Sequence, residues 1–422
     1  MCDELEERKQ AMLMYHVQGY SKAVISRQLK RSRPWLDRWL ARYDPGAGVR
    51  SLHAQKAGPK QGQSPWSAAI RQQVLTLRRV RSQDPQWRYA YRGAEALHFE
   101  LKALGSAEVP PIRTLHTWFV AEGLVPAKEK EKAARPSKPI PIPAPERVNH
   151  MQQLDLKGPV YLTGARTKYY LVVLRDRYSQ RCAIAVLENR EAPGIVDFLL
   201  RSWQWLGLPD YLQMDNALEF RGSNRYPRAF GRLVRVAVAL GLEPLFNPPG
   251  EPWRNGGVEW FNSFLGDRLL KIRFEDVQAL RTEAQVCQEA CNQSHYLPQF
   301  EGLTPHQLAA SVTLRFPPQD EPQPQTHPLP PAQGFVSFGR LVRKSGRITL
   351  GAGDRFMVEP NLAYQYVLAR VDLAKQCVHI SYEACLLKTY DFSSETVGAW
   401  ADEAQPVPDP LDEQVVKEQV IV

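Results

Sequence analysis

Three acidic residues have the types and the neighbours that a phosphoryl-transfer site uses. Asp155 interrupts an apolar run in the sequence QQLDL, Asp215 ends the run YLQMD, and Glu259 follows the glycine pair in NGGVE. Carboxylates that lie close together raise each other's pKa unless cations neutralise them. Their hard oxygen ligands suit Mg²⁺ or Mn²⁺. Two such ions, about 3.5–4 Å apart, can activate an attacking oxygen and stabilise the leaving oxygen of an in-line displacement.

The elements around these acids follow the order of an RNase H-like sheet. Three strands joined as hairpins come first, and helices then alternate with two further strands, which requires crossover connections. We therefore predict a five-stranded mixed sheet with the three carboxylates converging at one edge, the third entering from a helix. The predicted strands are residues 151–156, 169–176, 181–187, 211–214 and 243–246, and the predicted helices are residues 192–207, 227–241 and 258–271.

Taken singly, each acid also has an ordinary structural explanation. Asp155 could cap a turn, an Asp at a strand end is common, and a Glu in the first turn of a helix is favoured by the helix dipole. Asp176 and Glu219 could add negative charge near the predicted site, but we expect both to be structural. No Ser, Tyr or His lies in a recognisable nucleophile motif, so we predict no covalent enzyme–substrate intermediate.

The N-terminal third is strongly basic. Residues 1–147 carry 26 Lys and Arg against 14 Asp and Glu, a net charge of +12, whereas the rest of the 422-residue chain sums to −3. This asymmetry favours a polyanion-binding end over a merely soluble surface. No apolar run reaches the roughly 18 residues that span a bilayer, and the charged start lacks a signal core, so we expect a cytoplasmic protein. Six scattered cysteines without a CxxC pair favour reduced, buried thiols.

The basic region has the pattern of two helical trios. In the first, Ser21 and Ser32 are predicted N-caps, and Arg33, Arg38 and Arg42 lie outside an apolar helix face. That pattern is typical of a helix-turn-helix whose arginines contact phosphates and bases, with a trihelical protein-interaction module as the alternative. The predicted helices are residues 4–17, 21–29 and 34–43 in the first trio, and 67–81, 93–103 and 113–122 in the second.

Two proline-rich segments divide the chain, with six prolines in residues 126–147 and seven in residues 316–333. Short alternating runs after the second segment predict a small β-barrel. The fold class is therefore multidomain: α-helical helix-turn-helix domains, an α/β RNase H-like core and a small C-terminal barrel. The predicted domains are two helix-turn-helix domains (1–50 and 64–125), a linker (126–147), the RNase H-like core (148–311), a Pro-rich linker (312–333), the small β-barrel (334–395) and a disordered acidic tail (396–422).

Residues 148–311 resemble the catalytic core of bacterial insertion-sequence transposases of the retroviral-integrase superfamily. The resemblance lies in Leu154-Asp155, Asp215-Asn216, the run from Pro249 to Asn262 with its "P…NG…E…N" signature, and the segment from Asn292 to Thr304-Pro305. The flanks are similar too, because tandem helix-turn-helix units precede these cores and a barrel follows them in Mu-type transposases.

The resemblance implies that Asp155, Asp215 and Glu259 hold two Mg²⁺ or Mn²⁺ ions per active site. It implies metal-dependent hydrolysis that frees a 3′-OH at each element end, followed by strand transfer into target DNA. The implied partners are double-stranded DNA, both element ends and target, and further copies of the chain on that DNA, with no membrane. The implied location is the nucleoid of a bacterial cytoplasm. Candidate DNA contacts near the core are Asn216, Arg254, Asn255, Arg268 and Lys271.

Two departures from the family leave alternatives open. The 43 residues between Asp215 and Glu259 exceed the usual spacing, with the excess around residues 221–228. Gly266, seven residues after Glu259, stands where the family usually carries a Lys or Arg, so either Arg268 or Lys271 substitutes or the protein is impaired. The alternatives are an RNase H-fold nuclease or resolvase, and a domesticated or inactive DNA-binding protein, although retention of all three acids argues against decay.

Overall fold

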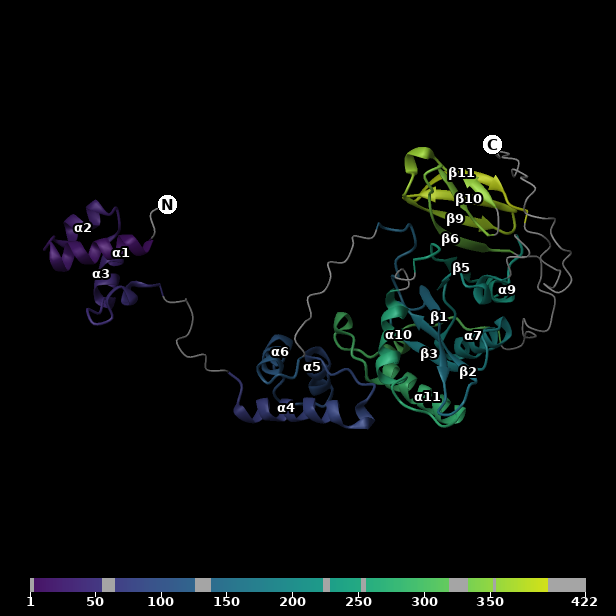
Figure 1. Cartoon of the computed structure of the whole chain (residues 1–422), viewed down its shortest axis with the longest axis horizontal. Coiled ribbons are helices and arrows are strands. Elements are labelled where there is room, and N and C mark those ends of the chain that lie inside the picture. The colour runs from purple at the N-terminus through teal and green to yellow at the C-terminus, as the bar shows by residue number, and fades with distance from the viewer. Residues whose placement is uncertain are drawn as a thin grey trace. The chain divides into compact units, whose positions relative to one another are not determined.

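The structure, a computed structural model, divides the chain into two compact units, Met1–Ser67 and Ala68–Val422 (Figure 1). It describes residues 4–54, 65–125, 138–222, 228–251, 256–318, 333–351 and 354–393. The predicted acidic tail, most of both proline-rich segments, the centre of the segment 221–228, Arg254 and Asn255 lie outside the described residues. Within the described part, no helix is long and apolar enough to cross a bilayer.

The N-terminal unit is built from three helices around a core of its own. Leu36 and Trp39 bury the inner face of the third helix. Ser32 begins that helix as predicted, since its hydroxyl accepts a hydrogen bond from the backbone N–H of Trp35 at 3.4 Å. Ser21 occupies the matching position before the second helix, but its side chain makes no capping hydrogen bond. The helices are α1 (Glu4–Met12), extended by a π-helical turn (Leu13–Val17), α2 (Lys22–Gln28) and α3 (Arg33–Arg42).

The second helical trio belongs to the larger unit and packs against its α/β core. Tyr89 donates a hydrogen bond to Glu283 at 2.6 Å. The backbone of Gly302 lies directly against the side chain of Phe99 on α5. A Cβ added at Gly302 would lie 2.1 Å from Cδ1 of Phe99, so only glycine fits. The helices match the predicted ones to within a few residues: α4 (Ala68–Gln83), α5 (Ala94–Ala103) and α6 (Ile112–Ala121).

The core contains a mixed sheet in the order β11-β10-β9-β6-β5-β4-β1-β2-β3. β1 pairs antiparallel with β2 and parallel with β4, and β4 pairs parallel with β5. The strands of the predicted RNase H-like part are β1 (Met151–Tyr161), β2 (Lys168–Asp176), β3 (Cys182–Leu187), β4 (Tyr211–Met214) and β5 (Glu243–Phe246). The helices are α7 (Ala192–Leu206), α8 (Leu218–Arg221), α9 (Arg232–Ala239), α10 (Gly256–Arg268), α11 (Val277–Ser294) and α12 (Pro305–Ala310).

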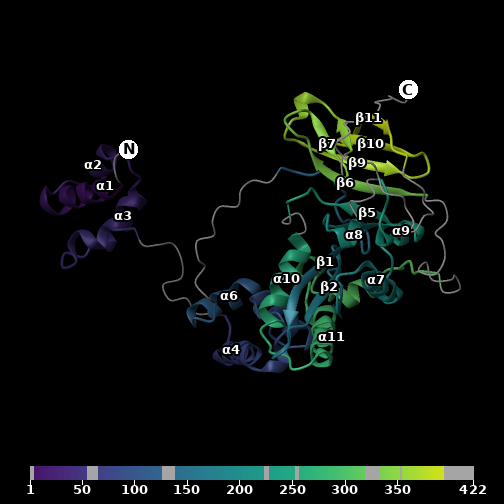
Figure 2. The same ribbon diagram turned by 45° about the vertical axis from the view of Figure 1, so that its right-hand side comes forward.

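Helices cover both faces of this sheet, with α7 and α9 on one side and α10 and α11 on the other (Figure 2). The alternation of β2 shows the two layers, because Val172 and Leu174 join the core with α7 whereas Leu171 and Val173 join the core with α10 and α11. Residues two apart on a strand share a face, so β1 sends Leu154 to the first layer and its odd-numbered neighbours toward α10.

The C-terminal strands extend the core sheet, which bears on two predictions. The described sheet has nine strands where five were predicted, and the predicted small barrel is not confirmed because this sheet does not close. β5 would otherwise be an edge strand with free backbone N–H and C=O groups, and β6 pairs with it in parallel at Leu245–Ser337. The C-terminal strands are β6 (Phe335–Leu341), β7 (Arg347–Thr349), β8 (Arg355–Met357), β9 (Tyr366–Asp372), β10 (Cys377–Tyr382) and β11 (Cys385–Asp391).

Candidate active site

Two of the three acids lie side by side on neighbouring parallel strands. Asp155 is in β1, and Asp215 directly follows β4. Gln153 pairs with Gln213 in the register of these strands, so each Asp lies two residues beyond the same paired position. Because such positions share a face and neighbouring strands lie about 4.8 Å apart, the two carboxylates project from one face at one level. Gln153 donates to Oε1 of Gln213 at 2.9 Å on this face.

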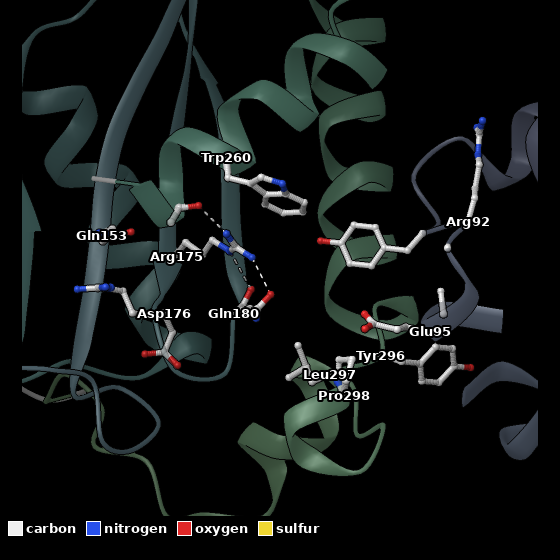
Figure 3. A pocket seen from close by; sticks show the side chains of 15 residues that line it. Arg92, Glu95, Gln153, Arg175, Asp176, Gln180, Trp260, Tyr296, Leu297 and Pro298 are labelled. Atoms are coloured by element: carbon white, nitrogen blue, oxygen red, sulfur yellow. Dashed lines mark hydrogen bonds between the residues drawn. The ribbon is translucent and has the colours of Figure 1, made fainter. Parts of the chain in front are cut away.

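The third acid, Glu259, reaches the same face from the first turn of α10. That turn is fixed to the sheet at two points. Oε1 of Gln153 accepts a hydrogen bond from the backbone N–H of Val258 at 3.1 Å. Nη1 of Arg175, on β2, donates to the carbonyl oxygen of Gly257 at 2.7 Å (Figure 3). A Cβ at Gly257 would lie 2.7 Å from Oε1 of Gln153, so glycine permits this close approach.

The pKa of Asp155 responds to the charges of the other two acids. The pKa of Asp155 is raised to about 6, chiefly by burial and also by the charges of Asp215 and Glu259, while hydrogen bonds from the Leu156 N–H and from Asn262 oppose the rise. Burial also raises the pKa of Asp215 and that of Glu259. Such a set of crowded, partly buried carboxylates gains stability from a divalent cation, because a cation offsets both burial and mutual repulsion.

The chemistry of the donor set fits hard divalent ions. Three carboxylates supply only oxygen ligands, which Mg²⁺ and Mn²⁺ prefer. Their oxygens are less tightly grouped than those of a preformed three-ligand site. Of the described residues, the group whose ligand atoms all lie within 4.8 Å is Asp372, Cys377 and His379 on the C-terminal strands. One oxygen of Asp372 already accepts hydrogen bonds from two backbone N–H groups of the following turn.

The hydrogen bonds of Asp155 tie it to α10. Its Oδ2 accepts from Nδ2 of Asn262 at 2.6 Å, and its Oδ1 accepts from the N–H of Leu156 at 2.9 Å. Asp215 is held by the N–H of Ala217, which donates to its Oδ1 at 2.8 Å. Each of these two acids therefore keeps a defined orientation.

Asn216, predicted to contact DNA, has both side-chain groups engaged within the chain. Its Nδ2 donates to the carbonyl oxygen of Asn247, and its Oδ1 accepts from Nη2 of Arg340 at 3.0 Å. Arg340 comes from β6 and is almost fully buried. The C-terminal strands therefore hold the loop that carries Asp215, and DNA contact by Asn216 stays a prediction.

The other predicted DNA contacts lie in two places. Arg33 and Arg38 are exposed on α3, whereas the guanidinium of Arg42 lies 5.0 Å over the ring of Trp39. Nη1 of Arg268 donates to the carbonyl oxygen of Arg88 at 2.6 Å. Lys271, in the turn after α10, forms an exposed ion pair with Asp267 at 3.2 Å.

Asp176 and Glu219 differ in their relation to the site. Asp176 is fully buried and accepts hydrogen bonds from Ser179 and from the N–H of Asn149, which is the structural role expected of it. Glu219 forms an ion pair with Arg190 at 3.3 Å, and its charge also raises the pKa of Asp215. Glu219 therefore adds negative charge at the edge of the site.

A pocket of about 590 Å³ adjoins the first turn of α10, on the side facing the second helical trio. Figure 3 shows Trp260, Arg175 and Gln180 on one side of it and Arg92, Glu95 and Tyr296 on the other. The guanidinium group of Arg175 is held by two hydrogen bonds, because it donates to Oε1 of Gln180 at 2.9 Å as well as to the carbonyl oxygen of Gly257. Its role is to position α10.

Sequence reasoning missed the residues that hold the acids. Gln153 lies two residues before Asp155, so the strand alternation that places Asp155 on the α10 face also places Gln153 there. Asn262 lies three residues after Glu259, on the same side of a helix. Both could have been found from spacing alone. Arg175 and Arg340 could not, because their contacts depend on strand pairings distant in the sequence.

Comparison with known proteins gives one match in sequence and several in structure. Residues 3–49 match the homeodomain-like domain family, which confirms the first predicted helix-turn-helix domain. No curated protein matches the chain.

Similar solved structures include the HTLV-2 integrase catalytic core domain in complex with magnesium, 18% identical, covering 39% of this chain and 99% of that chain, with a TM-score of 0.31. The BIV integrase catalytic core domain is also 18% identical and covers 39% of this chain and 95% of its own, with a TM-score of 0.30. A simian T-cell lymphotropic virus intasome in complex with PP2A regulatory subunit B56 gamma is 16% identical and covers 57% and 78%, with a TM-score of 0.31.

Proposed function

We propose that this protein is a DNA transposase of the DDE type, which cuts DNA at an element's ends and joins those ends to a target. The observation that carries the proposal is the convergence of three acids. Two parallel strands present Asp155 and Asp215 at one level, and α10, anchored by Gln153 and Arg175, adds Glu259 to the same face.

In this proposal Asp155, Asp215 and Glu259 would together hold two divalent ions. Bound ions would supply Lewis acidity at the scissile phosphate and a lowered pKa for the attacking hydroxyl. The chain's own contribution is orientation. Asn262 directs one oxygen of Asp155, the Ala217 N–H directs Asp215, and the anchored first turn of α10 directs Glu259.

The reaction has two steps at one site. Water first attacks the phosphodiester at the element's end, so that the P–O3′ bond breaks, the element keeps a 3′-OH and the flanking DNA keeps a 5′-phosphate. That hydroxyl then attacks a phosphate of the target DNA, and as the new P–O bond forms the target's own P–O3′ bond breaks and leaves a 3′-OH on the target. Both steps develop charge on a phosphorus with five oxygens, so one arrangement of charge serves both. The homeodomain-like domain, with Arg33 and Arg38 exposed on α3, would hold the DNA ends.

The test of chemistry uses the full chain, Mg²⁺ or Mn²⁺, and duplexes taken from the DNA that flanks the gene. Asp155→Asn keeps the side chain's shape and removes its charge, so it should abolish both cleavage and the joining of pre-cleaved ends while DNA binding persists. Asp267→Asn is the matched control, since Asp267 is an exposed acid on α10. Joining by Asp155→Asn at the unsubstituted rate would overturn the assignment of the site.

The test of DNA binding separates this proposal from its alternatives. Reversing Arg33, Arg38 and Arg42 to Glu should weaken binding to duplex DNA, and the affinity of the unsubstituted chain should fall steeply as salt rises. A chain that binds DNA but neither cuts nor joins it with either metal would be the non-catalytic DNA-binding protein. A chain that cuts but never joins pre-cleaved ends would be the nuclease.

A further inference from the structure

β1 and α10 meet in a regular series of contacts. Gln153 accepts from the N–H of Val258 at 3.1 Å, and Asp155 accepts from Asn262 at 2.6 Å. Each contact advances two residues along the strand and four along the helix. Two strand residues span about 6.6 Å and four helix residues about 6 Å, so the two elements stay in step. The next contact of the series should join residues 157 and 266.

The next residues of the series are Lys157 and Gly266, and they do meet. A Cβ built on Gly266 would lie 3.4 Å from Nζ of Lys157 and 3.6 Å from its Cε. A methyl group at Gly266 would make ordinary van der Waals contact with this ammonium group, and a longer side chain there would compete with it for the same space. Lys157 therefore places a positive charge on α10's active-site face, one helical turn beyond the contact between Asn262 and Asp155.

This ammonium group has no anionic partner among the described residues. Lys157 forms no ion pair there, whereas Lys271 pairs with Asp267 and Arg268 donates to the carbonyl of Arg88. The three nearby carboxylates do not fill that role in the proposed reaction, because two divalent ions would neutralise them. A lysine beside such an ion-loaded site would be repelled unless an anion lies between them.

We infer that Lys157 binds a phosphate of the DNA strand next to the one that reacts, in the place that Gly266 leaves open on α10. This inference rests on the proposed function. The bulge in the pairing of β1 with β2 follows Lys157 directly, and bulges of this kind redirect side chains beside active sites. The ligand class is a phosphodiester, recognised by a point charge without regard to sequence.

The first experiment moves the charge from the strand to the helix. Lys157→Ala should weaken joining of pre-cleaved ends roughly tenfold, mainly as a rise in KM for the end duplex. Lys157→Ala with Gly266→Lys should recover most of that loss, because the new side chain starts from the same space. Lys157→Ala with Gly266→Ala is the control for helix propensity, and it should fold at least as well without recovering activity.

The second experiment identifies the phosphate. End duplexes carrying a single neutral methylphosphonate at each position in turn are bound by the unsubstituted chain and by Lys157→Ala in Ca²⁺. At one position next to the joining end, the methylphosphonate should cost the unsubstituted chain about tenfold in affinity and cost Lys157→Ala almost nothing, since the contact is already lost. This non-additivity would support the inference.

Four results would overturn it. Effects of Lys157→Ala and of the methylphosphonate that add at every position would show that Lys157 contacts no phosphate. Failure of Gly266→Lys to recover activity in a folded Lys157→Ala chain would show that the charge at this place is not what matters. If the unsubstituted chain joins DNA and Lys157→Ala joins it equally well, this inference fails and the proposed function stands, whereas absence of all DNA binding removes both.

Discussion

The two faces of β1 carry opposite kinds of interaction. Toward α7, Leu154 and Leu156 pack in the main apolar core with Trp203. Toward α10, Asp155 and its odd-numbered neighbours make hydrogen bonds, and Lys157 contributes a charge. The apolar face stabilises the sheet by filling volume, whereas the polar face is arranged by the direction of individual hydrogen bonds. Substitutions of adjacent residues on β1 should therefore have different effects: those on the apolar face should lower stability, and those on the polar face should lower activity.

The largest effect is expected on the apolar face. Leu154 is fully buried, so Leu154→Ala should lower the free energy of unfolding by about 2–5 kcal/mol, through lost burial and the cavity left behind. Urea unfolding followed by circular dichroism measures this loss. A change below about 1 kcal/mol would mean that the two faces do not divide their roles in this way.

On the polar face, Glu259→Gln should reduce catalysis and leave stability almost unchanged. The substitution keeps the volume and removes a charge that the proposed ions need, so the joining rate should fall about a hundred- to a thousandfold. Single-turnover joining assays and thermal unfolding of the same sample separate the two quantities. If Glu259→Gln lowered stability and the joining rate together, the proposed division of roles between the two faces would be wrong.

The next effect is a pH-dependent one on Asp155 in EDTA. Its pKa is raised to about 6 from an ordinary value of 3.8, so the folded chain binds this proton more tightly than the unfolded chain does. The carboxylate therefore destabilises the fold progressively as pH rises from about 4 to 6, by up to about 3 kcal/mol above pH 6. Asp155→Asn should be more stable than the unsubstituted chain at pH 7.5, and about equally stable at pH 4. If the difference in stability between Asp155→Asn and the unsubstituted chain stayed constant from pH 4 to pH 7.5, the pKa of Asp155 would not be raised.

The smallest effect is expected at Asn262. Asn262→Ala removes the 2.6 Å hydrogen bond to Asp155 without touching the apolar face. The joining rate should fall roughly fivefold, as expected for loss of about 1 kcal/mol of orientation, and the melting temperature should change little. The loss should be greater below pH 7 than at pH 8, because that hydrogen bond lowers the pKa of Asp155. If Asn262→Ala joins DNA at the unsubstituted rate at both pH values, Asn262 has no positioning role.

Alternation and capping made much of the fold predictable from the sequence. The strands β4 and β5 have the predicted bounds, and the helix-turn-helix prediction is confirmed by the family match to residues 3–49. These features depend on local patterns of apolar residues and on capping residues such as Ser32. The three acids were predicted as a set, and the structure places them on one face, although their role stays a proposal.

Long-range pairing could not be predicted in the same way. The alternating runs of β6 and β9 fit a separate barrel as well as an extended sheet, because one strand's pattern does not say which edge it joins. The structure shows β6 joined to β5 by the parallel pairing of Leu245 with Ser337, and the barrel is not confirmed. For the same reason the position of Lys157 could not be predicted. It lies against Gly266, which has no side chain and belongs to another element.

The contact between Arg340 and Asn216 also sets an order of events during synthesis. The nascent chain can form β1 to β5 long before β6 leaves the ribosome, but the loop after Asp215 lacks its guanidinium until residue 340 has been added and β6 has paired with β5. Chains truncated before β6 would keep the homeodomain-like domain and all three acids without this support. Support of the Asp215 loop is thereby delayed until β6 has been made.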